Sequence, residues 1–346
     1  MRKHTPVANQ FELERLLRLT ERVGIDPLLT QASTGNSSMK LDGILWIKAS
    51  GKRMADAMRG DILLPLDLNE LITECLLQGL DPAERYPCAS LETAMHATLP
   101  HRVALHVHCV NTIAWAVRKD ALMQLQPRLE GLPWQWVPYT ASGLPLAREI
   151  ENALAARPGT NLFVLANHGL VVAGEDPKNV ENLLIEVARR LAIPPRKAHP
   201  ADYQVLAKIC EHSRWGLPDN DGVHSLGTDA VSQAIVAGGL LYPCQAILSE
   251  SGTSDLFRPI PCPSPGEQWQ SPYSDRPFLI IQGCGVIVNR SARPAELAMI
   301  SGLAQVVQRL SVSAPVRYLT ESEVAGIPSQ AAYRYRELAN AGQERR

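Results

Sequence analysis

Two pairs of apolar segments in this chain are separated by connections that are too short for parallel strands. Two residues separate Met39–Leu41 from Ile44–Ile47, and three separate Leu162–Ala166 from Leu170–Ala173. Parallel neighbours need a crossover of roughly a dozen residues or more, whereas an antiparallel hairpin closes with about two. Each pair therefore predicts an antiparallel hairpin, which argues against a purely parallel sheet.

Helical patterns lie between these strand-like segments. Gln10–Arg22 carries apolar residues mostly on one face and is followed by Gly24, a pattern typical of an amphipathic helix. Leu146–Ala156 and the segment from Asp176 to Leu191 are also expected to be helical. Strands and helices thus alternate, and we predict an α/β fold whose helices pack on a mixed, largely antiparallel sheet.

The second half of the chain contains a partial internal repeat. Residues 162–172 and residues 278–288 have similar apolar patterns, and each leads into a predicted helix with proline at its start. Cys284 stands in the second segment where His168 stands in the first. If the repeat is real, the second half is a degenerate α/β copy that lacks this histidine.

Length and composition limit the classes of function. The 346 residues suffice for one large domain or two ordinary ones, which we place at residues 1–198 and 199–346. Hydrophobic residues make up 45% of the chain, enough for a substantial core, and the net charge of -1 gives no electrostatic reason to expect nucleic-acid or membrane binding. The seven cysteines form no C-x-x-C pair, and no leader-like segment occurs, so we expect reduced thiols in the cytoplasm.

Three histidines have the spacing of metal ligands. His106 and His108 are two residues apart on a predicted strand, so both side chains should project from one face. His168 lies in the short turn between two other strands. Neutral imidazole suits Zn²⁺, and three protein ligands leave a coordination position open for a substrate. An alternative is a set of surface histidines bound to water.

Glu92 and His96 lie together on a predicted helix from Leu91 to Thr98, with Ser90 as its cap. An acidic residue in a first helical turn is common because the helix dipole favours it, so the position alone leaves catalysis and capping open. His96 is four residues later on the same face. We interpret it as a neighbour stacked on the preceding turn, with support of the metal site as the alternative.

Three loops rich in glycine and hydroxyl residues precede the histidines. They are Thr34–Ser38, Ser50–Lys52 and Ala89-Ser90. Such loops offer backbone N–H groups, hydroxyls and a cation to an anion, although ordinary turns use the same residues. Together they favour an oxyanion pocket near the metal ligands.

These motifs, in this order, resemble the class II aldolase/adducin family. The motifs are Gly35-Asn36-Ser37-Ser38, Ser50-Gly51, Ser90-Leu91-Glu92-Thr93, His106-Val107-His108 and Asn167-His168-Gly169. The resemblance covers roughly residues 10 to 195 and implies a three-layer α/β/α fold. The short link between Glu92 and His106 is similar to that in the aldolase half of large rhamnulose-phosphate aldolase/dehydrogenase proteins. The second half of the chain resembles theirs as well.

The resemblance assigns roles to individual positions. It implies that His106, His108 and His168 bind Zn²⁺ or another divalent ion and that Glu92 is the acid/base. Tyr139 falls in the loop where the aldolases keep a tyrosine acid.

The resemblance also implies a phosphate site lined by Asn36, Ser50, Gly51 and Ser90. The small sugar-phosphate aldolases have a second serine just before the glutamate, where this chain has Leu91. One phosphate hydroxyl is therefore missing, and we expect Lys52 to supply a compensating charge unless the substrate is not a simple phosphate.

The activity that the resemblance implies is an aldolase. It would cleave a ketose, expected to be a sugar 1-phosphate, by a retro-aldol reaction through a metal-bound enediolate. A sugar-phosphate epimerase or dehydratase would use the same residues, and a non-catalytic interaction protein, as in the adducin branch, is a third alternative. Sites in this family form near subunit contacts, which implies a homo-oligomer unless the second half replaces part of such a contact.

Overall fold

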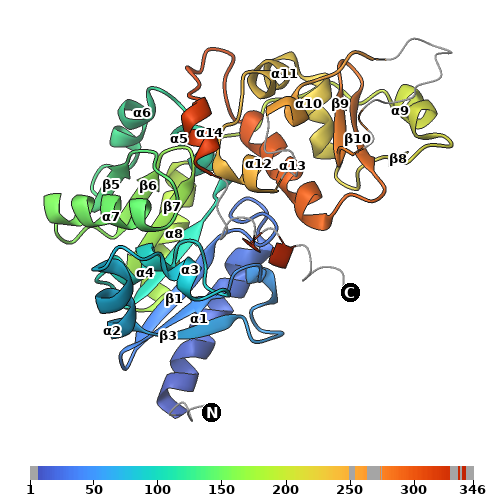
Figure 1. Ribbon diagram of the computed structural model, residues 1–346. Coiled ribbons are helices and arrows are strands. Elements are labelled where there is room, and N and C mark those ends of the chain that lie inside the picture. The colour runs from blue at the N-terminus through green and yellow to red at the C-terminus, as the bar shows by residue number, and fades with distance from the viewer. Residues whose placement is uncertain are drawn as a thin grey trace.

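The first half of the chain is built around a seven-stranded sheet. The computed structural model describes residues 7–248, 254–262, 273, 275–327, 334–335 and 337–339. The strand order is β3-β2-β1-β4-β7-β6-β5 (Figure 1). The strands are β1 Asn36–Leu41, β2 Ile44–Lys48, β3 Leu63–Asp67, β4 Val103–Val107, β5 Trp134–Val137, β6 Leu162–Leu165 and β7 Gly169–Gly174.

Both predicted hairpins are confirmed. In the first, β1 and β2 are antiparallel, with Leu41 opposite Ile44, and Asp42 and Gly43 have positive φ angles of 48° and 75°. This combination closes a two-residue turn whose twist matches that of the strands. The second hairpin joins β6 and β7, which are also antiparallel. Only β5 and β6 pair in parallel among the described strands of this sheet, so the sheet is mixed and largely antiparallel, as predicted.

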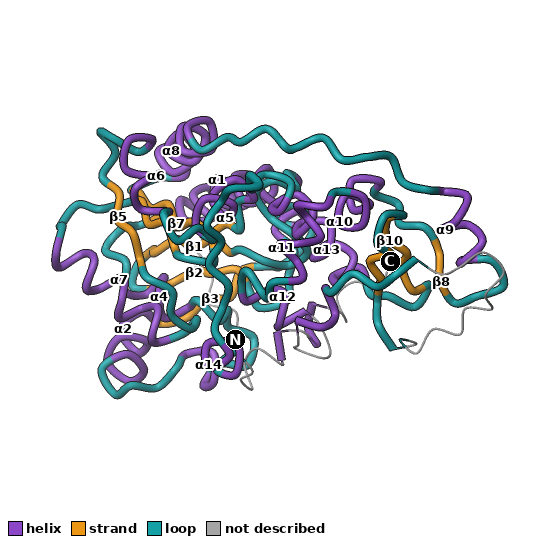
Figure 2. The backbone as a smooth tube through the Cα atoms, turned by 90° about the horizontal axis from the view of Figure 1, so that it is seen from above, coloured by secondary structure: helices purple, strands orange, loops and turns teal. Residues whose placement is uncertain are grey.

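Helices cover both faces of this sheet. Alternate residues of β4 point in opposite directions, so Leu105 packs with α1 and α8 while Ala104 packs with α4 and α7. Figure 2 shows α1 and α8 on one side of the strands and α4 and α7 on the other. The first-half helices are α1 Val7–Ile25, α2 Leu68–Glu70, α3 Pro82–Arg85, α4 Thr93–Thr98, α5 Val110–Ala116, α6 Ala121–Arg128, α7 Leu144–Ala156 and α8 Pro177–Arg190, with a π-helical stretch at Leu71–Leu76. The three-layer arrangement is the expected one.

A smaller antiparallel sheet and further helices form the second half. Its strand order is β8-β10-β9, with β8 Trp215–Gly216, β9 Phe278–Ile281 and β10 Gly285–Asn289. Its helices are α9 Tyr203–Cys210, α10 Ser225–Thr228, α11 Ala230–Ala237, α12 Pro243–Leu248, α13 Pro294–Val307 and α14 Glu321–Ala325. The succession β9-β10-α13 matches β6-β7-α8, each helix starting at a proline. The origin of the second half as a degenerate copy stays a prediction, as does the division at residue 198.

The two halves are joined at the turn between β6 and β7. Asn167 has a positive φ of 51°, and its side-chain amide donates to the carbonyls of Leu241 at 2.8 Å and Arg317 at 2.9 Å. The Arg317 guanidinium donates to the Asn167 side-chain carbonyl at 2.8 Å. The second half is therefore tied to the residue that precedes His168. No helix within the described residues is long and apolar enough to cross a membrane.

Replacing Leu105 by alanine should lower the free energy of unfolding by about 2–5 kcal/mol, because the side chain is fully buried and leaves a cavity under α1 and α8. Leu77→Ala is the matched control, since Leu77 is 77% exposed and its loss should change stability by less than about 0.5 kcal/mol. Urea unfolding followed by tryptophan fluorescence measures both. Equal midpoints for the two variants would contradict this packing.

Candidate metal centre and substrate pocket

The three histidines meet at the end of β4. His106 is the fourth residue of β4, His108 follows the strand directly, and His168 lies in the turn before β7. Strand β4 pairs with β7 so that His106 lies opposite Val171, which brings the turn to the same edge. The ring centroids are 4.9, 4.9 and 5.1 Å apart, and one nitrogen of each ring lies within 4.8 Å of the others. The structure thus brings all three predicted ligands together.

The chemistry of these rings fits a divalent metal ion. The Nδ1–H of His106 donates to the Leu170 carbonyl at 3.1 Å, which leaves its Nε2 with a lone pair that faces Nε2 of His108 at 3.0 Å. Burial lowers the pKa of all three imidazoles, that of His168 to about 3, so the rings are neutral. Buried neutral imidazoles whose lone pairs converge are the donor set that zinc and similar ions take.

Glu92 faces this group from the start of α4. Its Oε2 accepts hydrogen bonds from Asn36 at 2.9 Å and Ser90 at 3.1 Å, and its Oε1 accepts one from Ser142 at 3.1 Å and lies 3.9 Å from Nε2 of His168. Burial alone would raise the pKa of Glu92, but the facing His106 and His168 and the hydrogen bonds hold it below its ordinary value. The carboxylate is therefore ionised.

The helix that carries Glu92 starts two residues later than expected, at Thr93, and Glu92 itself occupies the capping position without a side-chain cap bond. The N–H of Thr93 donates to the Ser90 carbonyl at 3.1 Å instead. The Glu92 carboxylate is thus used for contacts across the pocket and not for capping, which was the alternative reading of its position.

His96 has a larger part than the sequence indicated. Its Nδ1 accepts from the Ser38 hydroxyl at 2.6 Å, and its Nε2–H donates to the side-chain carbonyl of Asn36. This bond orients the Asn36 amide so that its NH₂ points at Glu92. His96 is therefore a support of the acidic residue and not just a stacked neighbour. Both hydrogen-bond partners of His96 lie on β1, and the helix pattern of residues 92–96 gives no information about contacts with that strand.

Lys48 is a residue of this site that sequence reasoning missed. Its side chain is fully buried at the end of β2, and its ammonium donates to the carbonyls of Ser33 at 3.1 Å, Ala49 at 3.3 Å and Lys52 at 2.6 Å. Burial lowers its pKa to about 7, and Glu92 partly opposes this effect. A lysine within an otherwise apolar strand, two residues before Ser50, was the available signal.

A cavity connects Lys48 and Glu92 with His108 and His168. Of the predicted phosphate residues, Asn36, Ser50 and Ser90 line it, whereas the buried Gly51 and the exposed Lys52 do not. Leu91 also lines it, at the position where the small aldolases have serine. The volume is about 30 Å³, roughly the share of one water molecule. The remaining lining residues are Ser33, Thr34, Gly35, His108, Ser142, His168 and, from the second half, Pro243, Cys244, Ile247 and Tyr335.

Described residues near the C-terminus contact two of the loops that are predicted to bind an anion, at Ser33, just before Thr34–Ser38, and at Gly51. The hydroxyl of Ser33 donates to that of the partly buried Tyr335 at 3.0 Å. Gly51, with a φ of 72°, lies so close to Leu338 and Ala339 that a Cβ on Gly51 would sit 2.4 Å from Cβ of Leu338. Only glycine fits this position.

Tyr139 lies beside the site but not in the cavity. Its ring lies under the Arg317 guanidinium, with 5.4 Å between the Arg317 Cζ and the ring centroid, and its buried hydroxyl has no hydrogen-bond partner among the described residues. Burial raises its pKa to about 12. The structure therefore keeps Tyr139 protonated, and its role as an acid stays a prediction.

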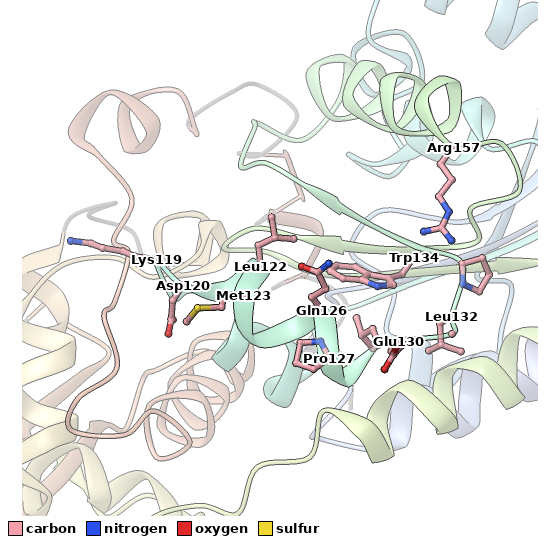
Figure 3. Close-up of a pocket in the computed structure, with 13 residues that line it drawn as sticks. Lys119, Asp120, Leu122, Met123, Gln126, Pro127, Glu130, Leu132, Trp134 and Arg157 are labelled. Atoms are coloured by element: carbon pink, nitrogen blue, oxygen red, sulfur yellow. The ribbon is translucent and has the colours of Figure 1, made fainter.

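A larger hollow of about 990 Å³ lies at the surface between α6 and β5 (Figure 3). Leu122 and Met123 from α6 and Trp134 from β5 line it. Its one aspartate, Asp120, is already bound by Arg118 at 2.8 Å and Gln124 at 3.0 Å. Among the described residues of this hollow no metal-ligating side chains converge, so size does not identify the reaction site.

Comparisons with known proteins bear on this geometry. Residues 14–193 match the family described as Class II Aldolase and Adducin N-terminal domain, and this match covers just over half of the chain. The chain belongs to this family. Class II aldolases are metal-dependent, and the buried group of three histidines could hold the metal.

The sequence identities with individual relatives are low. The chain is 26% identical over 188 residues, 47% of its length, to a Bacillus subtilis protein named uncharacterized oxidoreductase YuxG, and the match spans only 26% of that protein. It is similar to the N-terminal class II aldolase domain of a Thermoplasma acidophilum protein, with 21% identity, 55% of this chain and 95% of that chain covered, and a TM-score of 0.44. The corresponding values for L-fuculose-1-phosphate aldolase from Thermus thermophilus are 21%, 51%, 92% and 0.36.

The buried Lys48 predicts a pH dependence of stability in the metal-free protein. Its pKa falls from 10.5 in the unfolded chain to about 7 on folding. The unfolded chain therefore binds more protons between these values, and this group makes the free energy of unfolding rise with pH across that window. Lys48→Met should flatten the rise, and the exposed Lys208→Met should not. Urea titrations at pH 7, 8 and 9 measure the slope, and parallel slopes for parent and Lys48→Met would contradict the assignment.

Proposed function

We propose that this chain is a metal-dependent aldolase that cleaves a ketose, a sugar 1-phosphate, by a retro-aldol reaction. One observation carries the proposal. A carboxylate held by Asn36 and Ser90 directs its other oxygen to within 3.9 Å of His168, where three neutral imidazoles converge. A cation site with a fixed, ionised carboxylate beside it is the equipment for moving a proton next to a carbonyl.

The proposed metal is Zn²⁺, which His106, His108 and His168 would hold. When bound, it would supply Lewis-acid polarisation of the substrate carbonyl and adjacent hydroxyl. The three histidines leave room for a substrate because no fourth protein ligand belongs to the described group.

Glu92 is the proposed acid/base. Its Oε1 faces the histidines, so we assign this oxygen the proton at the carbon that becomes nucleophilic. In the synthetic direction the ionised carboxylate takes this proton. In the cleavage direction it first takes up a proton, which balances the one that the substrate hydroxyl loses, and then gives it to the same carbon. Asn36 and Ser90 hold the other oxygen and keep the carboxylate in this orientation. We also retain Tyr139 as the proposed acid for the second cleavage fragment, the one that Glu92 does not protonate.

The anionic end of the substrate would lie between Asn36, Ser50 and Ser90. Lys48 supports this assignment because its amino group lies at the wall of the cavity and is positively charged below its pKa of about 7. We keep Gly51 and Lys52 in the proposed anion site because they belong to the same loop as Ser50. A typical ligand pocket measures about 300–1,000 Å³, far more than the roughly 30 Å³ between these side chains. Covering residues such as Ile247 and Tyr335 must therefore move to admit a sugar phosphate.

Replacing Glu92 by glutamine should abolish nearly all cleavage while leaving metal binding intact, because the amide keeps the shape and loses the proton transfer. The loss should be about 10²–10⁴-fold in kcat. A panel of ketose 1-phosphates, with aldehyde and ketone products separated by chromatography, measures it. Parent-like cleavage by Glu92→Gln would remove Glu92 from the mechanism. Products of epimerisation or dehydration from the parent would select those alternatives, which use the same residues.

Metal removal gives a second expectation. A chelator should abolish the activity and lower the melting temperature. The ion binds the folded protein and not the unfolded chain, so its removal takes away that stabilisation. Zn²⁺ should restore both, and a His106→Ala variant should show neither response. A parent protein that contains no metal and is unaffected by chelation would favour an adducin-like interaction protein. A cytoplasmic location and a homo-oligomeric state remain part of the proposal.

A further inference from the structure

Helix α12 of the second half reaches the metal centre through one side chain. Cys244, the second residue of α12, is buried, and its Sγ lies 3.2 Å from Nδ1 of His108. The opposite nitrogen of that ring, Nε2, lies 3.0 Å from Nε2 of His106. Cys244 therefore contacts the histidine on the side that faces away from its partners.

The same kind of contact is made to His106 from the first half. There the Leu170 carbonyl accepts from Nδ1–H at 3.1 Å and leaves Nε2 free to bind an ion. A neutral imidazole has one N–H and one lone pair, so whatever accepts at Nδ1 decides which nitrogen is the ligand. The Cys244 sulfur is the described partner of Nδ1 of His108. A metal ion on Nε2 takes the lone pair there and leaves the N–H on Nδ1, so the sulfur is then the acceptor, although a weak one.

The backbone around Cys244 is held in place independently of the contact. The Gln245 side-chain carbonyl accepts from the N–H groups of Leu241 at 2.6 Å and Tyr242 at 3.2 Å. The Leu241 carbonyl in turn accepts from Asn167, next to His168. The backbone that carries the thiol is therefore tied to the residue beside His168.

We propose that Cys244 is a positioning residue of the metal centre, which accepts the Nδ1–H of His108 and so directs its Nε2 to the metal. The inference rests on the proposed metal site but not on the aldolase reaction. In this arrangement the second half does more than cover the pocket. It sets the protonation pattern of one ligand.

Metal affinity of the full-length protein tests the role without any substrate. Competition between the protein and a chromophoric chelator for Zn²⁺ gives the dissociation constant. Cys244→Ala should weaken binding by about 10–100-fold, the usual effect of removing a partner that orients a ligand. Cys244→Ser, which keeps an acceptor, should recover most of the affinity. Cys210→Ala is the control. Cys210 is also a buried cysteine of the second half, but it packs in a different hydrophobic cluster, with Leu206 and Trp215, so this variant should retain the parental affinity.

Two further readouts separate positioning from other roles. The melting temperatures of metal-free Cys244→Ala and Cys210→Ala should be alike, so that a weaker Zn²⁺ complex cannot be attributed to general destabilisation. With Co²⁺, the parent should lack the intense near-ultraviolet band of a thiolate-to-cobalt bond.

Each contrary result has a definite meaning. Unchanged Zn²⁺ affinity in Cys244→Ala, or a thiolate band that disappears in Cys244→Ser, would overturn the positioning role, the second by making Cys244 a direct ligand. A parent that binds no divalent ion would overturn both this inference and the proposed function. Metal binding that follows the expected order in a protein without aldolase activity would leave this inference standing alone.

Discussion

The antiparallel pairing of β4 with its two neighbours is the constraint on which the site depends. Asn36 of β1 lies opposite His106 on one side, and Val171 of β7 lies opposite it on the other. The first pairing places the amide that holds Glu92, and the second places the turn that carries His168. A slip of one residue in either ladder would turn these side chains to the opposite face of the sheet. The buried residues of β4, which pack in both helical layers, fix the register.

Burial of polar groups gives the site its electrostatic character. Glu92 stays ionised although it is buried, because three hydrogen bonds and the facing imidazoles stabilise its negative charge. The histidines stay neutral because burial disfavours a positive charge on them more strongly than the nearby Glu92 carboxylate favours it on His106 and His168. The Lys48 ammonium has three carbonyl partners and, within the described part of the chain, no bound carboxylate. The pocket thus combines fixed hydrogen bonds with incompletely balanced charges, a common property of catalytic sites.

Much of this arrangement could be predicted from local patterns. Short connections required antiparallel hairpins, and the spacing of His106 and His108 placed both on one face. The contacts of His96, Lys48 and Cys244 could not be predicted in the same way. Each depends on a partner outside its own helix or strand, respectively Asn36, the Ser33 carbonyl and His108. A charged or polar residue carries no signal of its burial until the strands that enclose it are paired. Lys52, chosen as the compensating cation, has the more usual fate of a lysine at the surface.

The amide of Asn167 has a consequence for the time at which the site matures. Its two acceptors belong to Leu241 and Arg317, and the second is synthesised 150 residues later (317 − 167). At about 5–20 residues per second of synthesis, that interval is roughly 8–30 s. During this interval all three imidazoles are already synthesised, while the turn that carries His168 still lacks its anchor at Arg317. In the nascent chain the three imidazoles are therefore held less firmly relative to one another than in the finished protein.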